Sequence, residues 1–427
     1  MSTDTTTAQP QTPADGGTPL LEADHVKLYF PIKQGVLIDR TVGHVHAVDD
    51  VSLRLNEGQT MGVVGESGCG KSTLARCFVR LLEPTDGALR YRGKDITHLG
   101  RKALDPMRRE VQLVFQDPVA SLNPRKRVGQ IVGTPLRLHG MEGRKVEDRV
   151  RDLLDRVGLN PEHINRFPHE FSGGQRQRIG IARALAVDPQ LIVLDEPVSA
   201  LDVSIQAQVV NLLDDLQDDL GLSYVFIAHD LSVVRHVSDQ IAVMYLGKLM
   251  EVSPARELYT KPMHPYTEAL LAAIPIPDPE ENSRRERDVL GGEPPNPINP
   301  PSGCRFHTRC PHATEICRTV EPPLAEYAGG HVAACHHPRN VTAEEVSSAT
   351  RSELSPLSAG REMPSANGAS RRPDGPGSSG PGDARPGPAA SERMHDAPPA
   401  GEAARSAGEV TESAGTAREA DDGGQSA

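Results

Sequence analysis

The sequence contains no tryptophan, few aromatic residues and no apolar run long enough to cross a membrane. Aromatic residues make up 3% of the 427 positions, and no apolar run approaches the ~20 residues that a membrane-spanning helix requires. The N-terminus lacks the basic and then apolar pattern of a signal peptide. The formal net charge of −12 argues against a large basic surface for nucleic acid. We therefore expect a soluble cytoplasmic protein that works at a membrane only through partners that span it.

Composition divides the chain into four regions. Residues 1–20 are rich in Thr, Pro and Gly, and residues 341–427 contain no Phe, Trp or Tyr. Both regions are predicted to be disordered, because they cannot bury enough apolar surface to offset the entropy of ordering. In residues 21–254, short apolar strands alternate with amphipathic helical stretches, which is typical of an α/β domain with a largely parallel sheet. Residues 255–340 form a smaller extension that is rich in Pro and carries four cysteines.

A glycine-rich loop, GESGCGKST, lies between the apolar run MGVV and the helical stretch that follows it. It fits the phosphate-loop pattern G-x-x-x-x-G-K-[ST] in the strand-loop-helix context that this pattern requires. Glycines let successive N–H groups turn inward around an anion, and the helix N-terminus adds partial positive charge. We predict that Lys71 reaches the β- and γ-phosphates of a nucleotide and that the Ser72 hydroxyl ligates Mg²⁺; a glycine-rich turn without a ligand is the alternative. The predicted nucleotide-binding residues are Gly65, Glu66, Ser67, Gly68, Cys69, Gly70, Lys71, Ser72 and Thr73.

Two adjacent acids end the apolar strand LIVLD. A buried strand that ends in two acids must hold a cation or carry out proton chemistry, unless the acids cap the element that follows. Asp195 suits the water shell of Mg²⁺, and Glu196 suits a general base that polarises an attacking water.

Three further polar positions are notable. Gln116 follows the strand VQLVF, and His229 ends the strand YVFIAHD, where a lone histidine is usually a structural hydrogen-bonding residue. The stretch FSGGQRQRIGIARAL opens with Ser172, Gly173 and Gly174, a small-residue helix N-terminus and thus a second candidate anion site. Taken by itself, SGGQ is more often a helix cap than a ligand site.

The order of these motifs resembles that of the ATP-binding subunits of ABC transporters over residues 21–254. This resemblance implies a phosphate-loop ATPase domain with a mixed sheet core and a helical subdomain. It also implies a head-to-tail dimer that sandwiches ATP, in which the signature of one chain faces the phosphate loop of the other. The residues that would serve the partner's ATP are Ser172, Gly173, Gly174 and Gln175, with Asp202 of the SALD stretch across the seam.

The same resemblance assigns roles around the attacking water. Glu196 would be the catalytic base, His229 would contact the γ-phosphate, and Gln116 would touch Mg²⁺ and relay the nucleotide state to membrane subunits. The aromatic residue that stacks on adenine is less clear. Residues 31–43 look like a loop insertion, and the candidates are Tyr29, Phe30 and His44.

The extension adds a narrower resemblance. Its HPYTEALL and PPSGCRFHTRC stretches are similar to the C-terminal region of ATP-binding subunits of dipeptide and oligopeptide importers. This implies an ATPase on the cytoplasmic face of the cell membrane that powers peptide import. Its partners would be two transmembrane permease subunits, a second ATP-binding subunit (a related chain or a second copy) and an extracellular peptide-binding protein, with no nucleic acid. The alternatives are import of nickel or another small solute, and a soluble ABC ATPase without a transport role.

The four cysteines of the extension are separated by five, six and seventeen residues. Four thiolates in a compact segment can hold zinc or an iron–sulfur cluster, and the spacing lacks the C-x-x-C pairs of common zinc ribbons. The resemblance implies a structural [4Fe-4S] cluster, whereas zinc, reduced thiols and two disulfides are the alternatives. The residues concerned are Cys304, Cys310, Cys317 and Cys335.

Cys69 lies inside the phosphate loop beside a helix N-terminus, where a thiolate is favoured. We therefore expect alkylation of Cys69 to block ATP hydrolysis and bound nucleotide to protect it. Cys77, one to two turns into the helix, is expected to be a small core residue.

Overall fold

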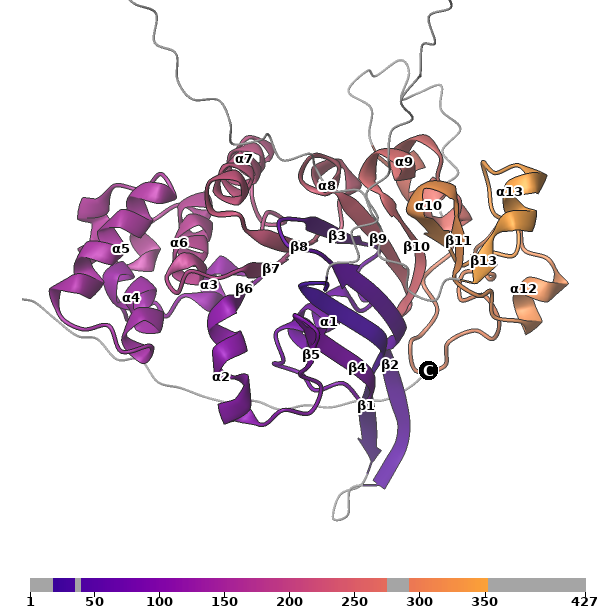
Figure 1. Cartoon of the computed structure of the whole chain (residues 1–427), viewed down its shortest axis with the longest axis horizontal. Coiled ribbons are helices and arrows are strands. Elements are labelled where there is room, and N and C mark those ends of the chain that lie inside the picture. The colour runs from indigo at the N-terminus through magenta and orange to yellow at the C-terminus, as the bar shows by residue number, and fades with distance from the viewer. Residues whose placement is uncertain (1–17, 35–39, 275–291, 352–427) are drawn as a thin grey trace, which may run out of the picture. The chain divides into compact units, whose positions relative to one another are not determined.

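The computed structural model of the chain describes residues 18–34, 40–274 and 292–351, all of which fall within one compact unit, Met1–Met363 (Figure 1). The predicted disorder of residues 1–17 and 352–427 lies outside these described residues. Residues 343–351, which the sequence assigns to the disordered tail, form α13 (Ala343–Ser348) and β13 (Thr350–Arg351). Thr342 caps α13 in a capping box with Glu345, which explains why this helix begins where it does.

A nine-stranded mixed sheet runs through the described residues. Its centre is parallel, in the order β9-β3-β8-β7-β6, and this confirms the expectation of a largely parallel sheet. The antiparallel strands β10, β12, β11 and β13 extend it from β9. The bounds are β3 (Thr60–Val64), β6 (Val111–Val114), β7 (Leu191–Asp195), β8 (Ser223–Ile227), β9 (Gln240–Tyr245), β10 (Lys248–Pro254), β11 (Ala325–Tyr327) and β12 (His331–Ala333).

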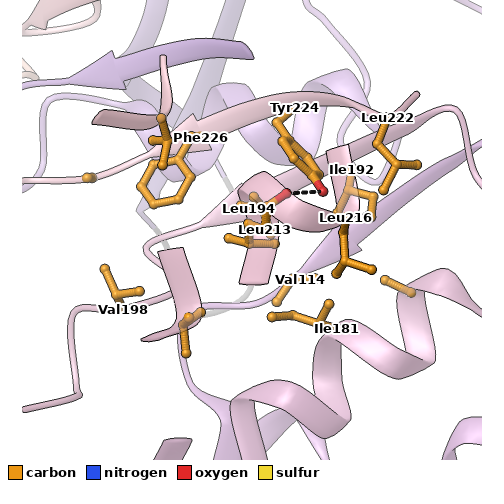
Figure 2. Packing of buried hydrophobic residues seen from close by; sticks show 14 of the residues in the cluster. Val114, Ile181, Ile192, Leu194, Val198, Leu213, Leu216, Leu222, Tyr224 and Phe226 are labelled. Carbon is orange, nitrogen blue, oxygen red and sulfur yellow. Dashed lines mark hydrogen bonds between the residues drawn. The ribbon is translucent and has the colours of Figure 1, made fainter. Parts of the chain in front are cut away.

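The parallel strands are buried on both faces, so they read as unbroken apolar runs. In β7, Leu191 and Val193 belong to one hydrophobic core, while Ile192 and Leu194 belong to the core on the opposite face. Figure 2 shows the second core, in which the Tyr224 hydroxyl donates a hydrogen bond of 3.0 Å to a backbone carbonyl of α7 (Val203–Leu220). A sheet covered on both faces holds the ends of its strands rigidly.

An antiparallel sheet of four strands packs against the first core. Its order is β2-β1-β4-β5, and its two longest strands form a hairpin. Residues 31–34 and 40–43, expected to lie in a loop, continue these strands instead. The bounds are β1 (Leu21–Gln34), β2 (Arg40–Leu55), β4 (Asp86–Tyr91) and β5 (Lys94–Asp95).

Helices lie along and beside the nine-stranded sheet, and α4, α5 and α6 pack together as a helical subdomain (Figure 1). Helix α5 buries Val146, Val150, Leu153 and Leu154, the i, i+4, i+7, i+8 stripe of an amphipathic helix. No helix of the described residues is both long enough and apolar enough to span a bilayer. The remaining bounds are α1 (Lys71–Phe78), α2 (Arg101–Glu110), α3 (Pro118–Ser121), α4 (Val128–Leu138), α5 (Arg144–Arg156), α6 (Gly173–Leu185), α8 (Leu231–Val237), α9 (Ala255–Thr260), α10 (Pro265–Ala272), α12 (Glu315–Thr319), and the 3₁₀ turns η1 (Pro161–Asn165), η2 (Pro168–Glu170) and η3 (Ala328–Gly330).

The extension is joined to this sheet rather than folded apart from it. Strand β12 pairs with β10, and the fully buried carboxylate of Glu251 in β10 holds the turn before α10. That carboxylate accepts hydrogen bonds of 2.8 Å from the backbone N–H groups of Met263 and His264, and it lies 2.6 Å from the imidazole of His331. Because a buried carboxylate needs several partners, Glu251 fixes the extension to the sheet.

Candidate nucleotide site

The phosphate loop lies between β3 and α1 and depends on glycine at its two ends. Gly65 has φ 150° and Gly70 has φ 107°. A Cβ atom at Gly65 would lie 2.1 Å from the Met244 carbonyl oxygen, and one at Gly70 would lie 2.0 Å from that of Ala47. Both contacts are with backbone that cannot yield, so no other residue fits either position.

Lys71 is the first residue of α1, and its side chain turns back into the loop. Its ammonium group donates hydrogen bonds to the carbonyl oxygens of Gly65 at 2.7 Å and Glu66 at 3.0 Å. The side chain is buried, and the cation lies where the helix N-terminus already favours an anion. The loop thus gathers a point charge and oriented N–H groups at one place.

Ser72, in α1, lies beside Asp195, the last residue of β7. The Ser72 hydroxyl donates a hydrogen bond of 2.7 Å to the carboxylate of Asp195, which ends β7. Burial raises the pKa of Asp195 above its ordinary value. Mg²⁺ binds through one or two such protein oxygens together with substrate phosphates, so the pair fits a magnesium site that nucleotide would complete.

Glu196 is the meeting point of the predicted catalytic residues. The Gln116 amide donates a hydrogen bond of 2.8 Å to its carboxylate, and His229 Nδ1 lies 3.7 Å from the same oxygen. Glu196 itself has φ 46°, a left-handed conformation that is costly for a residue other than glycine and typical of active sites. The three residues follow β7, β6 and β8, so the carboxyl ends of adjacent parallel strands bring them together.

The signature residues form the capped start of α6. The Ser172 hydroxyl accepts a hydrogen bond of 3.3 Å from the Gln175 N–H, and the Gln175 side chain accepts one of 3.0 Å from the Ser172 N–H. Ser172, Gly173 and Gln175 are exposed, whereas Gly174 is buried against α7. Asp202 is exposed at the start of α7. Among the described residues, the side-chain hydrogen bonds of Ser172 and Gln175 stay within the start of α6 and do not reach Lys71 or Glu196.

The three candidates for adenine stacking have different surroundings in the structure. Tyr29 donates its hydroxyl hydrogen bond to Asp49, and its ring centroid lies 4.4 Å from that of His46. Phe30 and His44 are exposed on the hairpin. The backbone of β2 touches the phosphate loop at Ala47, so the ring nearest that contact along the chain belongs to His46. The structure therefore adds His46 to the candidates, which the sequence analysis did not include, although the strand pattern HVHAV was a signal for it.

The four cysteines of the extension line one small cavity, together with histidines that include His264. All four thiols are free, so they form no disulfides. Their donor chemistry fits an iron–sulfur cluster. Their arrangement does not support that prediction, because no group of three or more His, Cys, Asp or Glu side chains in residues 18–34, 40–274 and 292–351 is placed to hold a metal ion.

The expectation that the thiolate form of Cys69 is favoured is wrong. Its thiol is 3% exposed, and burial raises its pKa even though Lys71 lies 3.8 Å away. Desolvation disfavours the thiolate more strongly than the nearby cation and helix end favour it. Cys77 is fully buried, as expected of a small core residue.

Comparison with protein families places two matches on the chain. Residues 48–199 match the model of the ABC transporter family, and residues 250–317 match that of the oligopeptide/dipeptide transporter C-terminal region. The first match includes the phosphate loop, the signature and the Glu196 strand, and the second includes three of the four cysteines.

Curated relatives align over nearly their whole length. The oligopeptide transport ATP-binding protein AppF of Bacillus subtilis is 55% identical over 74% of this chain and 97% of its own. OppF of Salmonella typhimurium, also an oligopeptide transport ATP-binding protein, is 53% identical over 74% of this chain and 95% of its own. The dipeptide transport ATP-binding protein DppF of Haemophilus influenzae is 50% identical over 75% and 97%.

A solved structure supports the fold. The ATP-binding cassette MJ0796, described as a dimer in a post-hydrolysis state bound to ADP and Pi, matches with a TM-score of 0.50 and 28% identity. The match covers 55% of this chain and 99% of that cassette. The predicted phosphate-loop ATPase fold with a mixed sheet and a helical subdomain is therefore confirmed.

Proposed function

The chain belongs to the ATP-binding proteins of oligopeptide and dipeptide ABC transporters, and on that premise we propose that it hydrolyses ATP to power peptide import. The observation that carries the proposal is the meeting of Glu196, Gln116 and His229 at the ends of three strands, together with a phosphate loop that holds Lys71. The names of its relatives, which include both oligopeptide and dipeptide transport proteins, support peptides as the cargo.

The residues divide the chemistry among them. Glu196 accepts a proton from the attacking water, and the hydrogen bond from Gln116 orients its carboxylate, with the His229 ring 3.7 Å away. Lys71 and the N–H groups of the loop bind phosphate oxygens and stabilise the charge that develops during transfer. Mg²⁺, when bound with ATP, neutralises phosphate charge; Ser72 and Asp195 are the residues that would hold it.

The exposed signature supports a site shared between two ATP-binding subunits. Ser172 and Gln175 cap their own helix and face solvent, and Asp202 is exposed nearby. We assign them to the nucleotide of a second ATP-binding subunit, either a related chain or a second copy. We further propose that the assembly contains two permease subunits and an extracellular peptide-binding protein, with this chain on the cytoplasmic face of the membrane; the names of its relatives, transport ATP-binding proteins, support this.

The cavity of four cysteines is the place where a [4Fe-4S] cluster would be held. Four thiols at one cavity support this assignment, and the absence of a metal-site arrangement among the described residues opposes it. Such a cluster would crosslink a segment that has little core of its own. Iron and acid-labile sulfide in stoichiometric amounts in the purified protein would support it, and their absence after anaerobic purification would refute it.

The proposed function is tested in a transporter reconstituted from this chain and its permease and binding-protein partners. Glu196→Gln should lower ATP hydrolysis by about 10²–10⁴-fold because general-base catalysis is lost, and peptide uptake should fall with it while ATP binding remains. The control is Glu83→Gln, at an exposed carboxylate bonded to His98, which should change neither rate. Uptake of nickel but not of di- or oligopeptides by the unmodified transporter would contradict the assignment of cargo.

A further inference from the structure

An arginine of the extension forms a bidentate ion pair with a residue of the phosphate loop. The guanidinium of Arg309 donates hydrogen bonds of 2.7 Å and 3.0 Å to the two carboxylate oxygens of Glu66, a residue 243 positions earlier in the chain. The Arg309 side chain is 5% exposed and that of Glu66 24%. A two-point bond between a planar guanidinium and a carboxylate fixes orientation as well as distance.

Glu66 is held at three points at once. Its carboxylate binds Arg309, its backbone N–H donates to the Tyr266 hydroxyl at 2.9 Å, and its carbonyl accepts the hydrogen bond from Lys71. Both Arg309 and Tyr266 belong to the region after β10. The residue that follows the first glycine of the loop is therefore positioned from outside the ATPase core.

Packed aromatic rings lie beside the bond between Arg309 and Glu66. Arg309 also donates a hydrogen bond of 3.3 Å to the hydroxyl of Tyr245, at the end of β9. The rings of Tyr245, Tyr266 and Phe306 pack on one another, with centroids 4.8–5.4 Å apart. Arg309 immediately precedes Cys310 of the cysteine cavity, so this packed group connects that cavity to the phosphate loop.

We propose that Arg309 is a positioning residue for ATP binding, through which the cysteine-bearing extension sets the affinity of the phosphate loop for ATP. It acts in two ways: it fixes the loop through Glu66, and it balances a carboxylate that would otherwise oppose the triphosphate. The proposal rests on the proposed function, because it requires that the loop bind ATP.

The second effect provides a sharp test by double substitution. Removing Arg309 leaves the partly buried Glu66 carboxylate without its bidentate partner, next to the place where the loop receives phosphates, and an uncompensated buried charge is costly. Neutralising Glu66 as well removes that repulsion. A purely structural role of Arg309 predicts no such recovery.

The experiment measures binding of Mg-ATP to the full-length chain by isothermal titration calorimetry. Arg309→Met should weaken binding about 10-fold, a typical size for coupling between sites. The double variant Glu66→Gln, Arg309→Met should bind within about 3-fold of the unmodified chain, since only the hydrogen bonds are then lost. The matched control is Arg339→Met, which removes a half-exposed arginine 3.5 Å from Glu268 within the same extension and should bind ATP normally.

The coupling between the extension and ATP binding can also be measured from the side of the extension. If the extension tightens ATP binding, ATP must stabilise the extension by the same factor. Amide hydrogen exchange in residues 304–317 should therefore slow about 10-fold on addition of Mg-ATP in the unmodified chain and in Arg339→Met, but not in Arg309→Met.

The outcomes separate the two proposals. Failure of the unmodified chain to bind ATP would defeat the proposed function itself. Normal ATP affinity of a folded Arg309→Met variant, or failure of Glu66→Gln to restore its binding, would overturn the role of Arg309 alone. If Arg309→Met unfolds, Arg309→Lys replaces it in the test. Lysine keeps the positive charge but lacks the planar guanidinium that makes two parallel hydrogen bonds to Glu66, so ATP binding should weaken about 3-fold. Unchanged ATP affinity of Arg309→Lys would overturn the proposal.

Discussion

The two groups of motif residues differ in how the fold treats them. One group, which we call the assembled half, lies in the phosphate loop and at the ends of adjacent strands, where Ser72 bonds to Asp195 and Gln116 bonds to Glu196; it consists of Lys71, Ser72, Gln116, Asp195, Glu196 and His229. The other, the exposed half, makes only local capping contacts; it consists of Ser172, Gly173, Gln175 and Asp202.

This contrast explains what each half can do alone. The parallel sheet positions the assembled half so that it can bind nucleotide and orient a base without help. The exposed half has oriented N–H groups at a helix start, and its side-chain bonds stay at that start. On the proposed function, we therefore expect the two half-sites of one chain not to complete each other and hydrolysis to require a second ATP-binding subunit.

The largest expected effect on ATP binding comes from removing the cation of the assembled half. Lys71→Met should weaken ATP binding by the isolated chain about 10²-fold, because losing one partner of a buried charge interaction costs several kcal/mol. Titration with Mg-ATP measures this. Lys94→Met, at an exposed lysine of β5, is the control. Equal affinities of the two variants would remove Lys71 from the assembled half.

The smallest expected effect is on stability, and it concerns Gly174 at the start of α6, beside the exposed half. A Cβ atom at Gly174 would lie 2.4 Å from Ile205 Cγ2, so Gly174→Ala should cost about 1–3 kcal/mol of unfolding free energy through overpacking between α6 and α7. Gly180, in the same helix, has open space, and Gly180→Ala should instead gain up to about 1 kcal/mol. Urea unfolding measures both. Equal stability changes would show that Gly174 has no packing role.

The assembled half was predictable because its residues sit in short patterns tied to strand ends. A strand that finishes in Asp195 and Glu196, and a loop that finishes in Lys71, carry their chemistry in the local sequence. Parallel order then brings such ends together without further information. The central sheet was predictable for the same reason, since strands buried on both faces are unbroken apolar runs.

What the sequence did not reveal depends on contacts between distant residues. The pair of Arg309 and Glu66 spans 243 positions, and no periodicity marks either partner. The raised pKa of the Cys69 thiol follows from burial that only the folded chain defines. The short elements at residues 343–351 form because β13 finds β11 as a partner, although their composition resembles the tail that follows.

The central claim is tested most directly at Ser172, in the exposed half. Ser172→Arg places a bulky cation at the start of α6 without touching the assembled half. The isolated chain should then bind Mg-ATP within about 2-fold of normal, whereas ATP turnover by the assembled transporter should fall about 10²-fold, the loss expected when a preorganised donor is removed. Weakened ATP binding by the isolated chain, or normal turnover in the assembly, would contradict the division into two half-sites.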